Sequence, residues 1–181
     1  AASNLDPDIT DANGKHDYFL AMADWVAPKV LSITLNPIYI LTGPTAFSLT
    51  FNEPMTVSED AASPILMVGA TNPLNYVLIS TGPDNVIDTL QCNDVAGSPA
   101  LGDDVLLTTD TVSYDQVTYT SALTVNGGVD LLPGKYRFLA CGHSPYAPRA
   151  LHDGVGNKMA ADYIFDFEVL EKEPDLPGTG F

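Results

Sequence analysis

The amino-acid sequence predicts an all-β fold, an antiparallel β-sandwich of about seven to nine short strands with an N-terminal extension. Three observations support this fold class. Short runs alternate apolar and polar residues, as Phe47, Leu49 and Phe51 do with their neighbours, which is the period of a half-buried strand. The 14 Pro and 14 Gly residues fall between these runs rather than in one tract, as turns between strands require. No stretch shows a long helical period.

The strands are predicted in chain order from these runs and their breakers. Pro54, for example, lacks a backbone donor and ends the run that begins at Phe47. The segments Asn126-Gly127-Gly128 and Leu132-Pro133-Gly134 flank a short link and predict a hairpin. A closed barrel would show more even spacing, so the sandwich is favoured. The predicted strands are 30–35, 47–51, 76–79, 86–87, 105–107, 112–114, 117–125, 135–141 and 163–170.

The chain divides into three parts: an acidic and apolar N-terminal extension (1–27), the sandwich (28–171), and a linker and tail (172–181). The extension is acidic at first and then apolar, in a stretch that fits either a helix or a strand. The apolar side chains of such a stretch have to be shielded from solvent, so the stretch either folds back on the sandwich or docks on another subunit. Its candidate assembly residues are Tyr18, Phe19, Leu20, Met22 and Trp25.

The charge balance excludes some classes of partner. Seven Lys and Arg against 23 Asp and Glu give 7 − 23 = −16, which disfavours nucleic acids and anionic membrane surfaces. No apolar run reaches the roughly 18 residues of a membrane span. No cofactor is expected, and calcium is the metal to consider. Asp11-Ala12-Asn13-Gly14 with Asp17 is similar to half of an EF-hand loop, but that alignment puts Ile9 and Leu20 at ligand positions.

The two cysteines, Cys92 and Cys141, form no Cys-x-x-Cys pair, and the spacing of Cys141 to His143 matches no catalytic signature. An even number favours a disulfide, and with it an oxidising, extracellular compartment. Two buried free thiols are the alternative.

The sequence contains no recognisable catalytic motif, so a non-enzymatic protein is predicted. His16, His143 and His152 are scattered, and no two of them share a motif. Paired carboxylates are too abundant in so acidic a chain to indicate a glycosidase, and a hydrolase ranks last.

Two short strings frame the predicted sandwich: Phe51-Asn52-Glu53-Pro54-Met55 and Asp153-Gly154-Val155-Gly156-Asn157. Together they resemble the bacterial Ig-like domain of the surface-layer-protein type (SbsA Ig-like), which opens with a Phe-x-Glu-Pro-Met strand end and closes with an Asp-x-x-Gly-Asn turn. Leu132-Pro133-Gly134-Lys135-Tyr136 is similar to the lead-in to a late strand of that family. The resemblance covers roughly residues 28 to 170 and implies an Ig-like sandwich. It also implies that the Tyr136 hydroxyl ties down a corner, although an ordinary core aromatic is an equal alternative.

The tail carries a sorting-signal-like string at Leu176, Pro177, Gly178, Thr179 and Gly180. It matches the Leu-Pro-x-Thr-Gly signal of sortases, transpeptidases that join the Thr carbonyl to an amine. The match departs from the usual signal because no apolar span and basic tail follow Phe181.

The function predicted from these features is a non-catalytic extracellular structural module of a bacterial cell-surface fibre, sheath, surface layer or adhesin stalk. Its expected partners are copies of itself, joined by β-strand addition through the N-terminal segment, or other cell-surface proteins. The alternative is a carbohydrate- or ligand-binding accessory module of a secreted protein. Its exposed aromatics would be Tyr39, Tyr114, Tyr119 and Tyr146.

Overall fold

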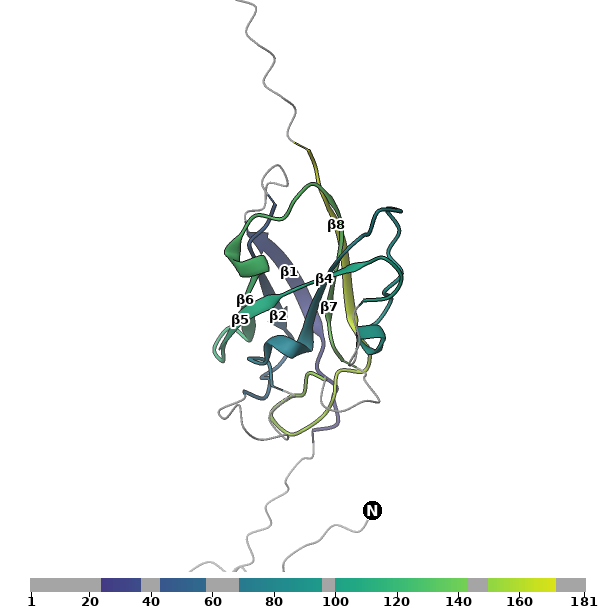
Figure 1. Cartoon of the computed structure of the whole chain (residues 1–181). Coiled ribbons are helices and arrows are strands. Elements are labelled where there is room, and N and C mark those ends of the chain that lie inside the picture. The colour runs from purple at the N-terminus through teal and green to yellow at the C-terminus, as the bar shows by residue number, and fades with distance from the viewer. Residues whose placement is uncertain (1–23, 37–42, 58–68, 96–99, 143–149, 172–181) are drawn as a thin grey trace, which may run out of the picture.

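The computed structural model describes residues 24–36, 43–57, 69–95, 100–142 and 150–171, and in these it confirms the all-β prediction. Eight strands form two four-stranded antiparallel sheets, in the orders β1-β2-β6-β5 and β4-β3-β7-β8, which face each other as a sandwich (Figure 1). No helix of the described part is long and apolar enough to cross a membrane. The strands are β1 (Val30–Asn36), β2 (Ala46–Phe51), β3 (Tyr76–Ser80), β4 (Val105–Leu107), β5 (Thr109–Asp115), β6 (Thr120–Val125), β7 (Gly134–Ala140) and β8 (Tyr163–Val169).

The main core lies between the two sheets. On β2 the inward residues Phe47, Leu49 and Phe51 are buried, as the alternation predicts. Phe47 stacks on Phe138 of β7 with ring centroids 5.1 Å apart, so β2 lies opposite β7. The Tyr76 hydroxyl of β3 lies 2.9 Å from Ser121 Oγ of β6, which satisfies two polar groups inside this core.

A second, smaller core covers the outer face of the β3–β7 pair. The segment 81–104, of which 81–95 and 100–104 are described and which we call the outer flap, lies over this face. Val77 and Ile79 of β3 are therefore buried on the side of the sheet that faces away from the main core. Cys92 of the flap is bonded to Cys141, with Cα atoms 5.6 Å apart, so the predicted disulfide is present and anchors the flap.

Three strand predictions are wrong in detail. Residues 86–87 form no strand, because they belong to the outer flap, where Val86 is exposed. Residues 117–119 are not part of β6 but of the turn between β5 and β6, where Tyr119 has a positive φ of 53°. The predicted hairpin around 126–134 does not form, because β6 already pairs with β2 and β5 and offers no free edge. The link instead crosses to β7 in the other sheet.

The Tyr136 hydroxyl ties down this crossing. It donates a hydrogen bond to the Leu132 carbonyl oxygen at 2.6 Å, and Tyr136 is buried. The hydroxyl contact implied by the resemblance is thus confirmed. The alternative holds as well, because the Tyr136 ring belongs to the main core and stacks on Phe167 with ring centroids 5.2 Å apart.

Candidate functional site

The two framing strings, about a hundred residues apart, meet at one end of the sandwich. Met55 and Asp153 pair as an isolated antiparallel bridge, and the Gly154 N–H donates to the Pro54 carbonyl oxygen at 3.2 Å. The Thr56 hydroxyl also donates to the Asp153 carbonyl oxygen. We call this end, formed by residues 24–29, 51–57 and 152–158, the N-terminal pole.

Asp153 organises the turn of the second string. Its side chain is only 2% exposed. One carboxylate oxygen accepts hydrogen bonds from the N–H groups of Val155 and Asn157 at 2.9 and 2.8 Å. The other accepts from Asn157 Nδ2 at 2.7 Å, so the buried charge is held by three donors of its own turn.

Two asparagines of the framing strings clamp residues 24–29, the lead-in segment, to the pole. Asn157 Nδ2 donates to the carbonyl oxygens of Asp24 and Val26 at 2.9 and 3.3 Å. Asn52 Oδ1 accepts from the Lys29 N–H at 2.6 Å, while the Asn52 N–H donates to the Lys29 carbonyl oxygen at 3.1 Å. The chain therefore reaches β1 along a path fixed by backbone hydrogen bonds.

Three carboxylates converge at this pole. Oxygens of Asp24, Glu53 and Asp153 lie within 4.8 Å of one another. Burial raises the pKa of Glu53, and the charges of Asp24 and Asp153 raise it further, against the opposing hydrogen bond from Asn52. Oxygen donors of this kind suit a hard divalent cation such as Ca²⁺, which would offset their mutual repulsion.

The lead-in segment also presents a large apolar side chain to solvent. Trp25 is 85% exposed and Val26 61% exposed, although the backbone around both is held by Asn157. The Val26 N–H is further bonded to Asp24 Oδ1 at 2.9 Å. The lead-in segment thus carries an exposed Trp side chain on a backbone that hydrogen bonds hold to the pole.

Most of the sequence-predicted site residues cannot be placed at this pole. Trp25 lies there, whereas the other assembly residues (Tyr18, Phe19, Leu20 and Met22), the stretch 9–20 that was compared with an EF-hand loop, and the tail residues 176–180 lie outside the described residues.

Two of the four aromatics proposed for a sugar platform, Tyr114 and Tyr119, are among the described residues. Tyr114 and Tyr119 are half-buried and pack against the main core, and the Tyr114 hydroxyl accepts a hydrogen bond from the Met55 N–H at 2.9 Å. Tyr39 and Tyr146 lie outside the described part. No observation among the described residues therefore favours the carbohydrate-binding alternative.

The clamp itself escaped prediction from sequence. Its two asparagines sit inside the framing strings, and only the distant pairing of those strings shows that both bind the same lead-in segment. The sequence around Asp24 likewise gives no sign of a carboxylate cluster, because only the fold brings Asp24 close to Glu53 and Asp153.

No protein-family model matches the sequence, and no curated protein matches it either. Among solved structures, the chain is similar to the crystal structure of the S-layer protein rSbsC, with 18% sequence identity and a TM-score of 0.43. The match covers 80% of this chain but only 14% of that one. Since a likeness of this size does not establish a relationship, function has to be inferred from contacts within the chain.

Proposed function

We propose that this chain is a non-catalytic extracellular structural module of a bacterial cell-surface fibre, sheath, surface layer or adhesin stalk. The observation that carries the proposal is Trp25, which is exposed while the backbone on both sides of it is fixed to the pole. Trp is enriched at protein–protein interfaces, where a single buried ring contributes much of the binding energy. A preset backbone lowers the entropy lost on binding.

The association is with copies of the same chain, through the N-terminal segment that leads to Trp25. An added strand needs a free sheet edge, and in the described sheets these edges are β1, β5, β4 and β8. Contact between the N-terminal segment of one copy and an edge of the next is head-to-tail, and it extends into a filament when the rotation between copies does not close a ring.

The extracellular setting is supported by the Cys92–Cys141 disulfide, since such bonds persist in oxidising compartments.

The tail is proposed to act in the same extracellular setting. In a longer precursor, Leu176 to Gly180 would serve as a sortase signal. Incubating the chain with a sortase and a glycine-bearing probe then breaks the Thr179–Gly180 peptide bond and joins Thr179 to the probe amine. Thr179→Ala abolishes this labelling, and labelling that persists in the variant argues against a sorting signal.

Deletion of residues 1–26 tests the assembly proposal. The shortened chain is expected to keep its β-sheet circular dichroism spectrum and to run as a monomer in size-exclusion chromatography with light scattering. Undiminished polymerisation of the folded deletion would contradict it.

A point variant separates Trp25 from the rest of the segment. Trp25→Ala should weaken self-association by about tenfold or more, because an interface Trp typically contributes 2 kcal/mol or more. The matched control is Val117→Ala, which truncates an 88%-exposed apolar residue in the β5–β6 turn and should leave association unchanged. Equal effects of both variants would point to general surface hydrophobicity instead.

A further inference from the structure

An apolar groove lies where β4 leaves the sheet that it shares with β3. β4 pairs only with Leu78 to Ser80 of β3, and the chain then passes through Thr108 into β5 of the other sheet. In the described sheets, the first residues of β3, Tyr76 and Val77, therefore have no strand beside them on this side. They line a groove of about 260 Å³.

Two leucines that line the groove are exposed to solvent. Leu74 of the 3₁₀ turn η2 (Pro73–Asn75) is 47% exposed, and Leu106 of β4 is 43% exposed. No described residue that lines the groove is charged, although the chain has a net charge of −16. A second copy of the chain therefore meets less repulsion at this groove than at the acidic parts of the surface.

Hydrogen bonds fix the shape of the groove. Asn72 Oδ1 accepts from the Leu74 N–H at 3.0 Å, and the Asn72 carbonyl oxygen accepts from the Asn75 N–H at 3.1 Å. The Thr109 hydroxyl donates to the Tyr76 carbonyl oxygen at 3.3 Å and so joins the start of β5 to β3. A preformed groove binds a partner without the entropy cost of ordering its walls.

Trp25 is the side chain of the same chain that suits this groove. It is 85% exposed, so it does not fill the groove of its own copy. The groove, at about 260 Å³, is smaller than small-molecule pockets of about 300–1,000 Å³ and suits one large side chain. The Thr108 hydroxyl lines the groove and donates to Asp110 Oδ1 at 2.8 Å, so its oxygen can accept from an indole N–H. Aromatic side chains that fill a pocket of the partner are the usual centres of protein interfaces.

The chain before Asp24 extends this apolar surface. Residues 18–22 include Tyr18, Phe19, Leu20 and Met22, and Met22 is three positions before Trp25, about 10 Å of extended chain. With Trp25 in the groove of another copy, these residues would reach the neighbouring Val105 of β4, which is 49% exposed. The groove and the exposed part of β4 would then be covered together.

We propose that Trp25 of one copy inserts into the groove between η2 and β4 of the next copy. This inference rests on the proposed function, because it names the surface that receives Trp25. The contact joins two different surfaces, so a copy that binds through its Trp25 still has a groove for another copy. A series of such contacts builds a filament when the rotation between copies does not close a ring.

Two complementary variants of the full chain test a single contact. Leu106→Lys keeps Trp25 but places a charge in the groove, whereas Trp25→Ala keeps the groove and contains no Trp, because Trp25 is the single Trp of the chain. Each variant alone should be monomeric in sedimentation velocity at concentrations at which the parent chain polymerises, and their mixture should form a one-to-one dimer. As Trp25→Ala is added, the fluorescence of Leu106→Lys should shift to shorter wavelengths, because its indole leaves water.

The matched control is Val117→Lys, which adds the same charge at an 88%-exposed residue of the β5–β6 turn. Both Lys variants lower the net negative charge, so repulsion between copies alone predicts association at least as strong as that of the parent chain. The groove contact instead predicts that only Leu106→Lys weakens association, by about tenfold or more. Leu74→Ala removes an exposed part of the groove without adding a charge and should also weaken association. Circular dichroism checks that each variant is folded.

The possible failures are distinguishable. If Trp25→Ala loses association while Leu106→Lys and Leu74→Ala associate like the parent chain, the groove contact is wrong and the proposed function stands. A lower melting temperature of the groove variants with unchanged association would assign the groove to a segment of its own chain, which also overturns the contact. A mixture that forms no dimer and shows no fluorescence shift would overturn it as well. A parent chain that stays monomeric would overturn both the contact and the proposed assembly.

Discussion

Asp153 shows at the scale of one residue why the second framing string has its composition. The carboxylate needs donors because it is buried, and the turn supplies them from the Val155 and Asn157 N–H groups and from the Asn157 side chain. The same Asn157 amide then reaches the lead-in segment. One buried charge thus organises the turn that fixes the path of the chain into β1.

Asp153→Ala should lower the free energy of unfolding by about 3 kcal/mol, because it leaves buried donors without an acceptor. Urea unfolding followed by circular dichroism measures this change. The control Asp130→Ala removes an exposed carboxylate and should change the free energy by less than about 0.5 kcal/mol. Similar values for the two variants would mean that the Asp153 hydrogen bonds add little stability.

Glu53 should make stability depend on pH. Its pKa is raised in the folded protein above the ordinary 4.5, mainly by burial and then by Asp24 and Asp153, so the folded state binds the proton more tightly than the unfolded state does. The ionised Glu53 therefore costs stability at neutral pH, and this cost disappears as the pH falls through the raised pKa and below 4.5.

Glu53→Gln removes this cost. The variant should be more stable than the parent chain at neutral pH, and the difference should vanish below pH 4.5. Urea unfolding at both pH values measures it. A gain that persists unchanged at the lower pH would assign the effect to packing rather than to ionisation.

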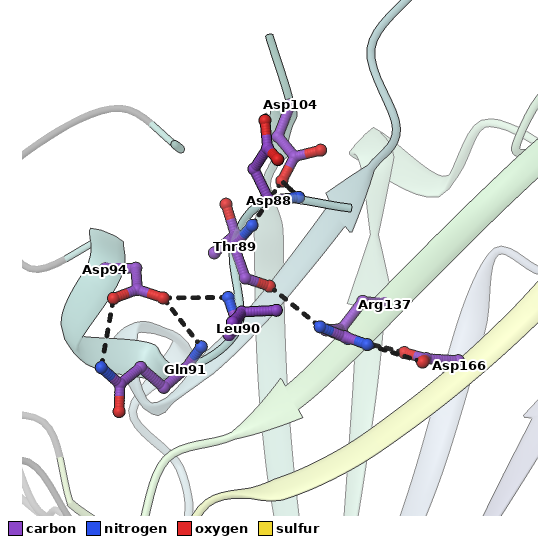
Figure 2. A network of polar contacts seen from close by, with 8 residues as sticks. All are labelled: Asp88, Thr89, Leu90, Gln91, Asp94, Asp104, Arg137 and Asp166. Atoms are coloured by element: carbon purple, nitrogen blue, oxygen red, sulfur yellow. Dashed lines mark hydrogen bonds and ion pairs between the residues drawn. The ribbon is translucent and has the colours of Figure 1, made fainter. Parts of the chain in front are cut away.

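At the scale of elements, the outer flap gives β3 two buried faces. Tyr76 and Leu78 face the main core, while Val77 and Ile79 face the flap, which the disulfide anchors. The flap has only one 3₁₀ turn, η3 (Cys92–Val95), among its described residues. It is therefore held by the disulfide together with the smaller core and hydrogen bonds such as that from Arg137 to the Thr89 carbonyl oxygen (Figure 2).

Replacing both cysteines by alanine should lower the free energy of unfolding by about 4 kcal/mol in the chain-entropy model, for a sequence separation of 49 residues. Urea unfolding of the oxidised chain and the double variant measures it. A reductant should destabilise the parent chain and leave the variant unaffected. A matching response of both would show that the disulfide is not the source of the loss.

The two faces of β3 should respond differently to reduction. Ile79→Ala and Leu78→Ala should each cost about 2–5 kcal/mol in the oxidised chain, since both residues are fully buried. Reduction should release the flap, which covers Ile79 but not Leu78. The loss of unfolding free energy caused by Ile79→Ala should therefore become smaller, while the loss caused by Leu78→Ala should stay the same. The two costs come from unfolding curves with and without reductant. An equal change in both would mean that the two cores unfold as one.

A strand of this sandwich can be predicted from the sequence where one of its faces is exposed to solvent. On β2 and β8, alternation marks both the strand and its inward residues. On β3, Tyr76 to Ile79 are all buried, and an unbroken apolar run cannot reveal what covers its second face. The carboxylate cluster at the N-terminal pole has no local signature, because its members come from segments that only tertiary packing brings together.

At the scale of the whole molecule, the charge of −16 opposes contact between copies. The proposed self-association through Trp25 would have to overcome this repulsion, which salt screens over a Debye length of about 10 Å at 0.1 M. Association should therefore strengthen when NaCl is raised from about 10 to 150 mM, as measured by sedimentation velocity. Weakening over this range would indicate that attraction between charges drives the contact instead.

The two ends of the sandwich determine how it would bear tension. Val30 of β1 pairs with Phe51 at the N-terminal pole, whereas β8 ends with Val169 paired to Gly134 at the far end (Figure 1). A pull on the two termini runs along the strands and shears many ladder hydrogen bonds at once instead of opening them one by one. The disulfide would also withhold about 170 Å of chain from stretching, from 49 residues at roughly 3.5 Å each. In the proposed surface fibre the module would thus yield late, and it would lengthen by about 170 Å less than the same chain without the disulfide.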